Sequence, residues 1–333
     1  MELAGKMALV TGASGFIGGH TARRLAIAEH MRVRALLRNP TGSTVVDLRH
    51  ALIEPVCGDL LEPPSLEAAC VGCDLIVHAA TDTALTNRRL IRATSVDGTR
   101  NLLRAAGVAG AQRFIFISTF DVYFGSLKQF RDEDTPVHPF GDLYADGKIL
   151  AEEVLLGSGT ALPAIVVLRP PAVFGPGSRE WTVQIIRDVQ RDRLFLPGGG
   201  RFPFPYVFID NLVDAIVAAA RRETASGIYN IVDGRMTYRE FVQPLVKLAG
   251  GRVHSIPFWL LWPAALISEG ITHLTGRWLP LSVNRMQILV DRSRVRFASA
   301  DKACNELGWL PQRDFAEGMR LTAEWLREHR YIK

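Results

Sequence analysis

The glycine-rich segment 11–18, Thr-Gly-Ala-Ser-Gly-Phe-Ile-Gly, constrains the fold of this chain more than any other feature. An apolar stretch at 7–10 precedes it and helical spacing of apolar residues follows it, so the segment is predicted to join a strand to a helix. In that setting Gly12 permits a tight turn, Gly15 lets the backbone approach a ligand, and Gly18 lets the helix pack closely on the strand. Free N–H groups at the helix start would bind an anion, so the segment predicts a cradle for a nucleotide diphosphate.

The alternation of short apolar strands and helical patterns through the first half of the chain predicts an α/β fold with a Rossmann-type, doubly wound parallel sheet. Strands are expected at 7–10, 33–37, 75–78, 114–118 and 164–168, and helices at 16–28, 96–105 and 144–156. Beyond Arg169 proline and glycine interrupt the pattern, which indicates a smaller C-terminal substrate-binding lobe. We expect a dinucleotide-binding domain at 1–168, to which 207–232 returns, and the lobe at 169–206 and 233–333.

Composition excludes several classes of function. With 333 residues, 48% of them hydrophobic, the chain is long enough to bury a substantial core. The net charge of +5 is dispersed without the aromatic interleaving of a nucleic-acid groove, so no nucleic-acid partner is expected. Cys70 and Cys73 lack a second cysteine pair or a histidine cluster, so no metal site is expected. Free thiols and the absence of a signal peptide predict a cytoplasmic protein.

Several further motifs occur in a characteristic order along nearly the whole chain. They are the glycine-rich turn and the segments 58–60, 77–80, 98–103, 118–123, 144–148, 168–176 and 229–231. With them the chain resembles the extended short-chain dehydrogenase/reductases of the NAD-dependent epimerase/dehydratase family. This group includes nucleotide-sugar epimerases and dehydratases, dihydroflavonol-type reductases and 3β-hydroxysteroid dehydrogenases, and the last two are the most similar. The resemblance implies an NAD(P)-dependent enzyme that forms a homodimer.

The resemblance also implies a set of cofactor contacts. Asp59 and Leu60 would lie near the adenine, while Pro170 and Val173 would flank the nicotinamide. The complete set implied is Gly12, Ser14, Gly15, Phe16, Ile17, Gly18, Asp59, Leu60, Ala79, Ala80, Thr81, Tyr144, Lys148, Pro170 and Val173. For Ala79, Ala80 and Val173, simple core packing is an equal alternative, because small and apolar residues are commonly buried.

Tyr144 and Lys148 are the candidate proton-transfer pair. They are one helical turn apart, and a nearby ammonium would favour the phenolate of a tyrosine whose pKa is otherwise near 10. Lys148 could also bind the nicotinamide ribose, and the resemblance gives Thr119 a hydroxyl that polarises the substrate oxygen. Ser118 is the competing hydroxyl, although strand alternation would turn the two side chains to opposite faces. The alternative for the pair is a merely structural contact on one helix face.

Arg38 indicates NADP rather than NAD. An acidic residue at the end of the second strand usually selects NAD, and here that position reads Leu-Leu-Arg-Asn at 36–39. Arg38 would bind the 2′-phosphate, as in the dihydroflavonol-type reductases whose sequence this stretch resembles, although NAD is not excluded. A surface arginine that follows a strand is the alternative interpretation.

Two segments favour a hydrophobic substrate. Nucleotide-sugar enzymes commonly carry a diphosphate-binding arginine at the position of Phe204, which here lies in an aromatic stretch at 201–206. Apolar lining would suit a steroid-, flavonoid- or polyketide-like carbonyl compound, with a nucleotide-sugar epimerase or dehydratase as the alternative. The apolar, tryptophan-containing segment 256–267 is too short to span a membrane, so a lid or core helix is favoured over peripheral membrane contact.

Overall fold

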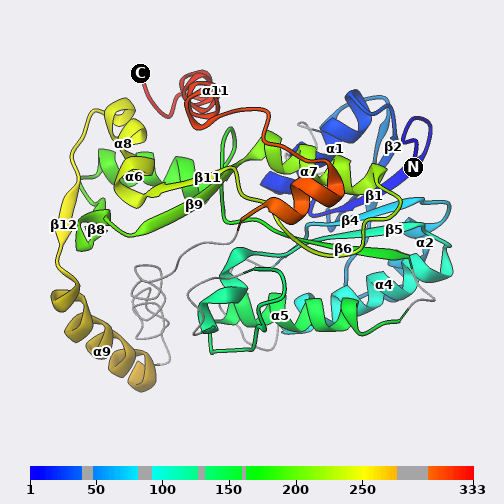
Figure 1. Cartoon of the computed structure of the whole chain (residues 1–333), viewed down its shortest axis with the longest axis horizontal. Helices are drawn as coiled ribbons and strands as arrows, with labels where there is room; N and C mark the ends of the chain where they lie inside the picture. Colours follow the sequence, from blue (N-terminus) through cyan, green and yellow to red (C-terminus); the bar gives the residue numbers. More distant parts are fainter. Residues whose placement is uncertain (40–47, 82–91, 127–131, 160–162, 276–298) are drawn as a thin grey trace.

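A computed structural model describes residues 1–39, 48–81, 92–126, 132–159, 163–275 and 299–333 (Figure 1). Its centre is a seven-stranded parallel sheet in the order β10-β6-β5-β4-β1-β2-β3. The strands are β1 (Met7–Thr11), β2 (Arg32–Leu37), β3 (Ile53–Cys57), β4 (Leu75–His78), β5 (Arg113–Ile117), β6 (Ala164–Arg169) and β10 (Gly227–Asn230). From β1 the chain adds β2 and β3 on one side and then β4, β5, β6 and β10 on the other, so the doubly wound fold is confirmed. Its ligand crevice is expected at the carboxyl ends of β1 and β4, where the strand order reverses.

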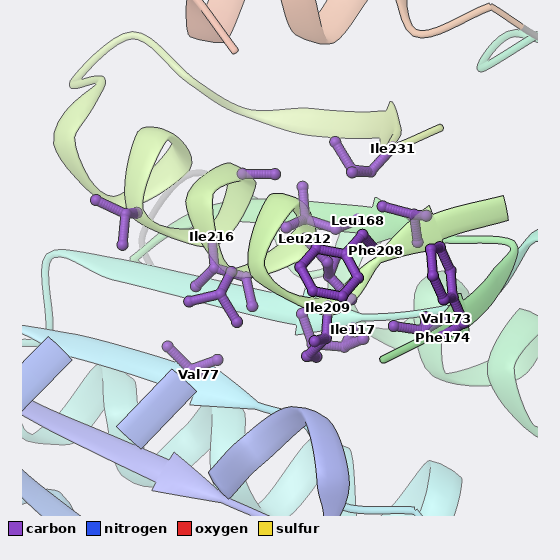
Figure 2. Close-up of a cluster of buried hydrophobic side chains, with 14 of the residues drawn as sticks. Val77, Ile117, Leu168, Val173, Phe174, Phe208, Ile209, Leu212, Ile216 and Ile231 are labelled. Carbon is purple, nitrogen blue, oxygen red and sulfur yellow. The ribbon is translucent and has the colours of Figure 1, made fainter. Parts of the chain in front are cut away.

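Helices cover both faces of this sheet. α1 (Phe16–Ile27) and α7 (Ile209–Arg221) pack together on one face, and α2 (Pro63–Cys70), α4 (Gly98–Val108) and α5 (Leu143–Leu156) cover the other (Figure 1). Successive strand residues supply the two cores, since side chains alternate between the faces of a strand. Figure 2 shows one of these cores, in which strand residues such as Val77 and Leu168 face Leu212 and Ile216 of α7.

The C-terminal part builds a smaller lobe beside the sheet. It contains the strands β7 (Ala172–Phe174), β8 (Phe195–Pro197), β9 (Pro203–Phe208), β11 (Gly234–Thr237) and β12 (His254–Ile256). Its helices are α6 (Ile185–Gln190), α8 (Tyr238–Ala249), α9 (Phe258–Thr275) and α11 (Phe315–Glu328). The whole chain also has shorter helical segments: η2 (Ala93–Asp97) and η3 (Phe120–Gly125) contact α5, and η4 (Arg179–Gln184), η5 (Gly198–Gly200) and η6 (Ala303–Leu307) follow later in the chain. The expected division into two domains stays a prediction.

Most expected elements are present with boundaries shifted by one to three residues, and three differences matter for the fold. The segment 207–232 was expected to return to the sheet, but its first residues end β9, which pairs with β7 and β11 outside the central sheet, and the chain rejoins that sheet only at β10. β5 ends at Ile117, one residue before the expected Ser118. β3 was not predicted because Glu54 and Pro55 are exposed in its middle, as is common in an edge strand, and they interrupt the apolar pattern.

The aromatic stretch 201–206 forms lobe core rather than an apolar substrate lining. Phe204 is buried and contacts the rings of Trp181, Tyr238 and Phe241. Strand β9 places Phe204 and Tyr206 on the same face because alternate residues share a face, and both pack against Phe241. Position 204 still lacks the arginine that is common in nucleotide-sugar enzymes. Because the Phe204 ring is packed in the lobe core, however, it is no evidence for a hydrophobic substrate.

Segment 256–267 continues from β12 into α9. Trp259, Leu266 and Ile267 are among its most exposed side chains, whereas Ala265 is buried. The expectation of a core helix is therefore wrong for this face, and a lid and a peripheral membrane contact both stay predictions. Within the described ranges, no helix is long and apolar enough to cross a membrane.

Candidate active site

Glycine lets the turn at 12–18 pack closely against neighbouring backbone. Gly12 has φ +69°, and a Cβ there would lie 2.7 Å from the amide nitrogen of Ala80. A Cβ at Gly18 would overlap the carbonyl of Gly12, so Gly18 lets α1 pack on the turn itself rather than on the strand. Gly15 precedes α1, and no side chain caps the helix there. The Gly15 N–H donates to Gly12 O at 2.8 Å and closes the turn. The first N–H groups of α1 can therefore bind the diphosphate of a dinucleotide.

His78 holds this turn to the neighbouring strand and helix. Its Nδ1 lies 2.8 Å from Thr11 Oγ1, and its Nε2 lies 3.0 Å from Thr99 Oγ1. The Thr99 hydroxyl donates to Ser95 O, and the Thr11 hydroxyl accepts from Ala80 N. Every hydrogen bond then has one donor and one acceptor if His78 carries its proton on Nε2, donates to Thr99 and accepts from Thr11 at Nδ1. Burial, followed by the charge of Lys148, lowers the pKa of His78 to about 3 and keeps it neutral. Sequence reasoning missed this role, although a histidine that ends an apolar strand was visible.

The end of β5 and the helix α5 bring the three predicted catalytic residues together. The Thr119 hydroxyl lies close enough to the Tyr144 hydroxyl to influence its ionisation, and Lys148 Nζ donates to Ile117 O at 2.7 Å. Asp142 caps α5 by accepting from the first backbone N–H groups, which fixes where the helix starts and so which residues face β5. The Asp121 N–H donates to Thr119 Oγ1 at 3.2 Å, which leaves the threonine proton free to point toward Tyr144 or a substrate oxygen.

Local electrostatics keep Tyr144 a neutral phenol. Burial raises its pKa, the carboxylates of Asp121 and Glu180 raise it further, and the hydrogen bond from Thr119 opposes them. Lys148 was expected to favour the phenolate, but its ammonium is bonded to Ile117 O, and this tuning stays a prediction. Burial lowers the pKa of Lys148 itself to about 8. Tyr144 is therefore suited to donating a proton at neutral pH.

Ser118, the competing hydroxyl, is bound elsewhere. Its Oγ donates to Glu152 on α5, and its side chain is buried. Thr119, by contrast, contacts Tyr144, so the geometry favours Thr119 as the group that orients a substrate oxygen.

The remaining predicted cofactor residues lie around the carboxyl ends of the strands. Asp59 and Leu60 follow β3, and Ala79, Ala80 and Thr81 follow β4. Leu60 is held by Asn101, whose side-chain amide donates to its carbonyl at 3.0 Å. Ser14 is exposed, and Phe16 and Ile17 are half-buried at the start of α1.

Pro170 lies in the connection from β6 to β7, and Val173 lies in the middle of β7. The Pro170 carbonyl accepts from Phe120 N at 2.8 Å, directly after Thr119. Val173 is buried in β7, and its carbonyl accepts from Ser178 Oγ. Pro170 therefore lies beside the Thr119 region, and the contacts of both residues with a nicotinamide stay predictions.

Arg38 is exposed immediately after β2, and its carbonyl accepts a weak hydrogen bond from Cys57 Sγ at 3.8 Å. Cys70 and Cys73 are buried thiols whose pKa values burial raises, as expected of inert cysteines. No group of histidine, cysteine and acidic side chains suited to a metal ion occurs in the part of the chain that the structure describes.

Comparisons with known proteins agree with this geometry. Residues 8–232 match the NAD dependent epimerase/dehydratase family. The chain is 27% identical to a 4-hydroxy-2-methyl-3-oxo-4-farnesyl-3,4-dihydroquinoline-1-oxide ketoreductase of Stigmatella aurantiaca, over 93% of each chain. It is 26% identical to a 3-beta-hydroxysteroid dehydrogenase of Mycolicibacterium neoaurum, over 91% of this chain and 86% of the relative. A dTDP-glucose 4,6-dehydratase of Streptomyces venezuelae with bound NAD has the same fold, with a TM-score of 0.77, 23% identity and 97% of each chain covered.

Proposed function

Because this chain belongs to the NAD-dependent epimerase/dehydratase family and is an NAD(P)-dependent oxidoreductase of the extended short-chain dehydrogenase/reductase type, we propose that it reduces a ketone on a hydrophobic small molecule to a secondary alcohol with NADPH. The observation that carries the proposal is the contact of Thr119 with Tyr144 beside a buried Lys148. The glycine turn at residues 12–18 fits the diphosphate of the cofactor, because Ser14 and Gly15 are exposed where the turn enters α1 and no side chain caps the first N–H groups of that helix.

The proposed chemistry assigns one task to each side chain. The reduced nicotinamide supplies a hydride to the carbonyl carbon. Thr119 donates a hydrogen bond to the ketone oxygen and orients it, and Tyr144 donates its phenolic proton to that oxygen, which completes the alcohol. Lys148 binds the ribose next to the nicotinamide, and its positive charge stabilises the phenolate that Tyr144 becomes. A neutral Tyr144 favours reduction over oxidation at neutral pH, since reduction consumes the phenolic proton.

The surroundings of Tyr144 support an uncharged substrate. Asp121 and Glu180 both act on Tyr144 electrostatically, so the negative charge around this hydroxyl favours an uncharged reacting group beside it. Phe204 stands where nucleotide-sugar enzymes commonly have an arginine, and its ring is packed in the lobe core. The ketoreductase and steroid dehydrogenase relatives point to the same class of substrate.

Steady oxidation of NADPH tests this function. We expect continuous loss of NADPH absorbance with a panel of steroid-like and polyprenylated aromatic ketones, in proportion to the alcohol formed. A nucleotide-sugar epimerase would instead reoxidise its cofactor within each turnover and leave the absorbance constant. Conversion of UDP- or dTDP-sugars without net NADPH consumption, together with no turnover of any ketone, would contradict the proposal.

Arg38 is the proposed source of NADP selectivity, because it is exposed at the carboxyl end of β2 where the adenosine ribose is expected. We expect Arg38→Ala to weaken NADPH binding roughly tenfold, about 1.4 kcal/mol, and to leave NADH binding within about twofold. Fluorescence titration of the cofactor-free protein measures both. Arg32→Ala, at the exposed opposite end of the same strand, is the matched control and should change neither affinity. An equal loss for both cofactors would refute the assignment.

A further inference from the structure

Three consecutive residues at the end of β5 contact three residues of α5 that are spaced four apart. The pairs are Thr119 with Tyr144, Ile117 O with Lys148 Nζ, and Ser118 Oγ with Glu152. Residues spaced by four share one face of a helix, so one face of α5 is tied to one strand end at three successive turns. The first two contacts belong to the proposed catalytic machinery, whereas the third has no part in the chemistry described above.

Glu152 is held more tightly than a surface carboxylate could be. Its side chain is 3% exposed and accepts from Ser118 Oγ, from Arg169 Nε at 3.0 Å and from Arg169 Nη2 at 2.5 Å. Arg169 ends β6, the strand next to β5, and its guanidinium lies 4.7 Å from the ring centre of Tyr123. The carboxylate is therefore fixed to two adjacent strands of the sheet.

The position of Glu152 matters for Lys148, which is one helical turn before it. The ammonium is buried, donates to Ile117 O and lies 4.6 Å from the centre of the Phe116 ring. Neither of these neighbours carries a formal charge to balance it. Glu152 supplies the nearby negative charge, and its hydrogen bonds hold that charge in place.

We propose that Glu152 is a positioning residue for Lys148: clamped by Ser118 and Arg169, its carboxylate holds α5 against the end of β5 and keeps the lysine ammonium charged and directed toward the cofactor ribose. The position and the charge of Glu152 are inferred from its contacts with Ser118 and Arg169. Only the destination of the ammonium, the ribose, rests on the proposed function.

The direction of the charge effect follows from the groups around Lys148. Burial lowers its pKa to about 8, and Glu152 on the same helix opposes that shift. His78 faces it from β4 but is neutral, and Tyr144 on α5 is a neutral phenol. Arg169, from β6, is paired with Glu152. Removal of the carboxylate charge therefore lowers the pKa of Lys148 further, and the lysine loses its proton at a lower pH.

The test is a direct titration of Lys148 in protein labelled with ¹³C at lysine Cε, its NMR signal assigned by its loss in Lys148→Arg. We expect Glu152→Gln, which keeps the shape of the side chain, to move the titration midpoint of Lys148 to lower pH by roughly one pH unit. Ser118→Ala removes one hydrogen bond and keeps the carboxylate, so it should leave the midpoint within roughly a third of a pH unit. The same midpoint in wild type and Glu152→Gln would overturn the proposal, because a merely structural ion pair lowers stability without moving this titration.

A second variant guards against failure of Glu152→Gln to fold, since an unpaired buried Arg169 is destabilising. Glu152→Gln combined with Arg169→Gln removes both charges and should give the same downward direction, and an unchanged midpoint there would also overturn the proposal. If ketone reduction is detected, the alkaline limb of its kcat/KM profile should move with the midpoint. The NMR titration needs no substrate. It therefore tests the role of Glu152 even if the proposed ketone reduction is not found.

Discussion

Tyr144→Phe should lower kcat for ketone reduction roughly a thousandfold and leave NADPH binding within about twofold. The phenol that contacts Thr119 is the proposed proton donor, and Phe keeps the ring while removing that proton. Without the donor, the oxygen that gains negative charge during hydride transfer has to be protonated by water. The effect should therefore be seen in kcat rather than in cofactor affinity. Stopped-flow single turnovers with NADPH and the active ketone measure the chemical step directly.

Tyr123→Phe is the matched control for this variant. Tyr123 is a buried tyrosine whose hydroxyl donates to Asn230 at 2.9 Å, so its replacement also removes a buried hydroxyl near the site. We expect it to cost about 1 kcal/mol of unfolding free energy and to change kcat less than about threefold. If the two variants lose activity equally, loss of packing rather than of the proton donor explains the effect, and Tyr144 is not the general acid.

Predictions from the sequence succeeded where local pattern determines structure. The apolar runs that became β1, β4 and β6 are buried on both faces, so composition alone marked them as interior strands. β3 was not predicted, because an edge strand tolerates the exposed Glu54 and Pro55, which interrupt the apolar pattern. The lobe was harder still, since β9 joins β7 and β11 through pairings that no periodicity encodes.

The candidate site shows the same division. Tyr144, Lys148 and Thr119 were predicted chiefly from the family resemblance, and the spacing of Tyr144 and Lys148 by one helical turn agreed with it. The contacts of two buried residues were missed: His78 joins Thr11 and Thr99 beside the glycine turn, and Glu152 binds Ser118 and Arg169 beside Lys148. Each of these contacts joins separate elements of the fold, so it becomes visible only when the strands are placed side by side.

Gly12→Ala should weaken NADPH binding at least a hundredfold, about 2.7 kcal/mol, and destabilise the protein by more than the conformation of the residue alone explains. Two effects combine at this position. Any L-residue with φ near +69° costs roughly 1–2 kcal/mol, and a Cβ here would also meet the backbone of Ala79 and Ala80 at 2.8 Å and 2.7 Å. Backbone atoms cannot move aside as the end of a flexible side chain can, so the turn and the residues after β4 have to separate. The N–H groups of the turn would then no longer converge on the diphosphate.

Gly72→Ala separates these two effects. Gly72 has φ +68°, almost the same as Gly12, but a Cβ there would meet no heavy atom of the described residues within 4 Å. We expect this control to lose the conformational 1–2 kcal/mol in urea unfolding and to bind NADPH as tightly as wild type. The difference between the two variants then measures the close approach of the glycine turn to the residues after β4. Equal NADPH affinity in both would show that this turn is not the cradle, whereas a binding defect confined to Gly12→Ala ties cofactor binding to the space that only glycine leaves open.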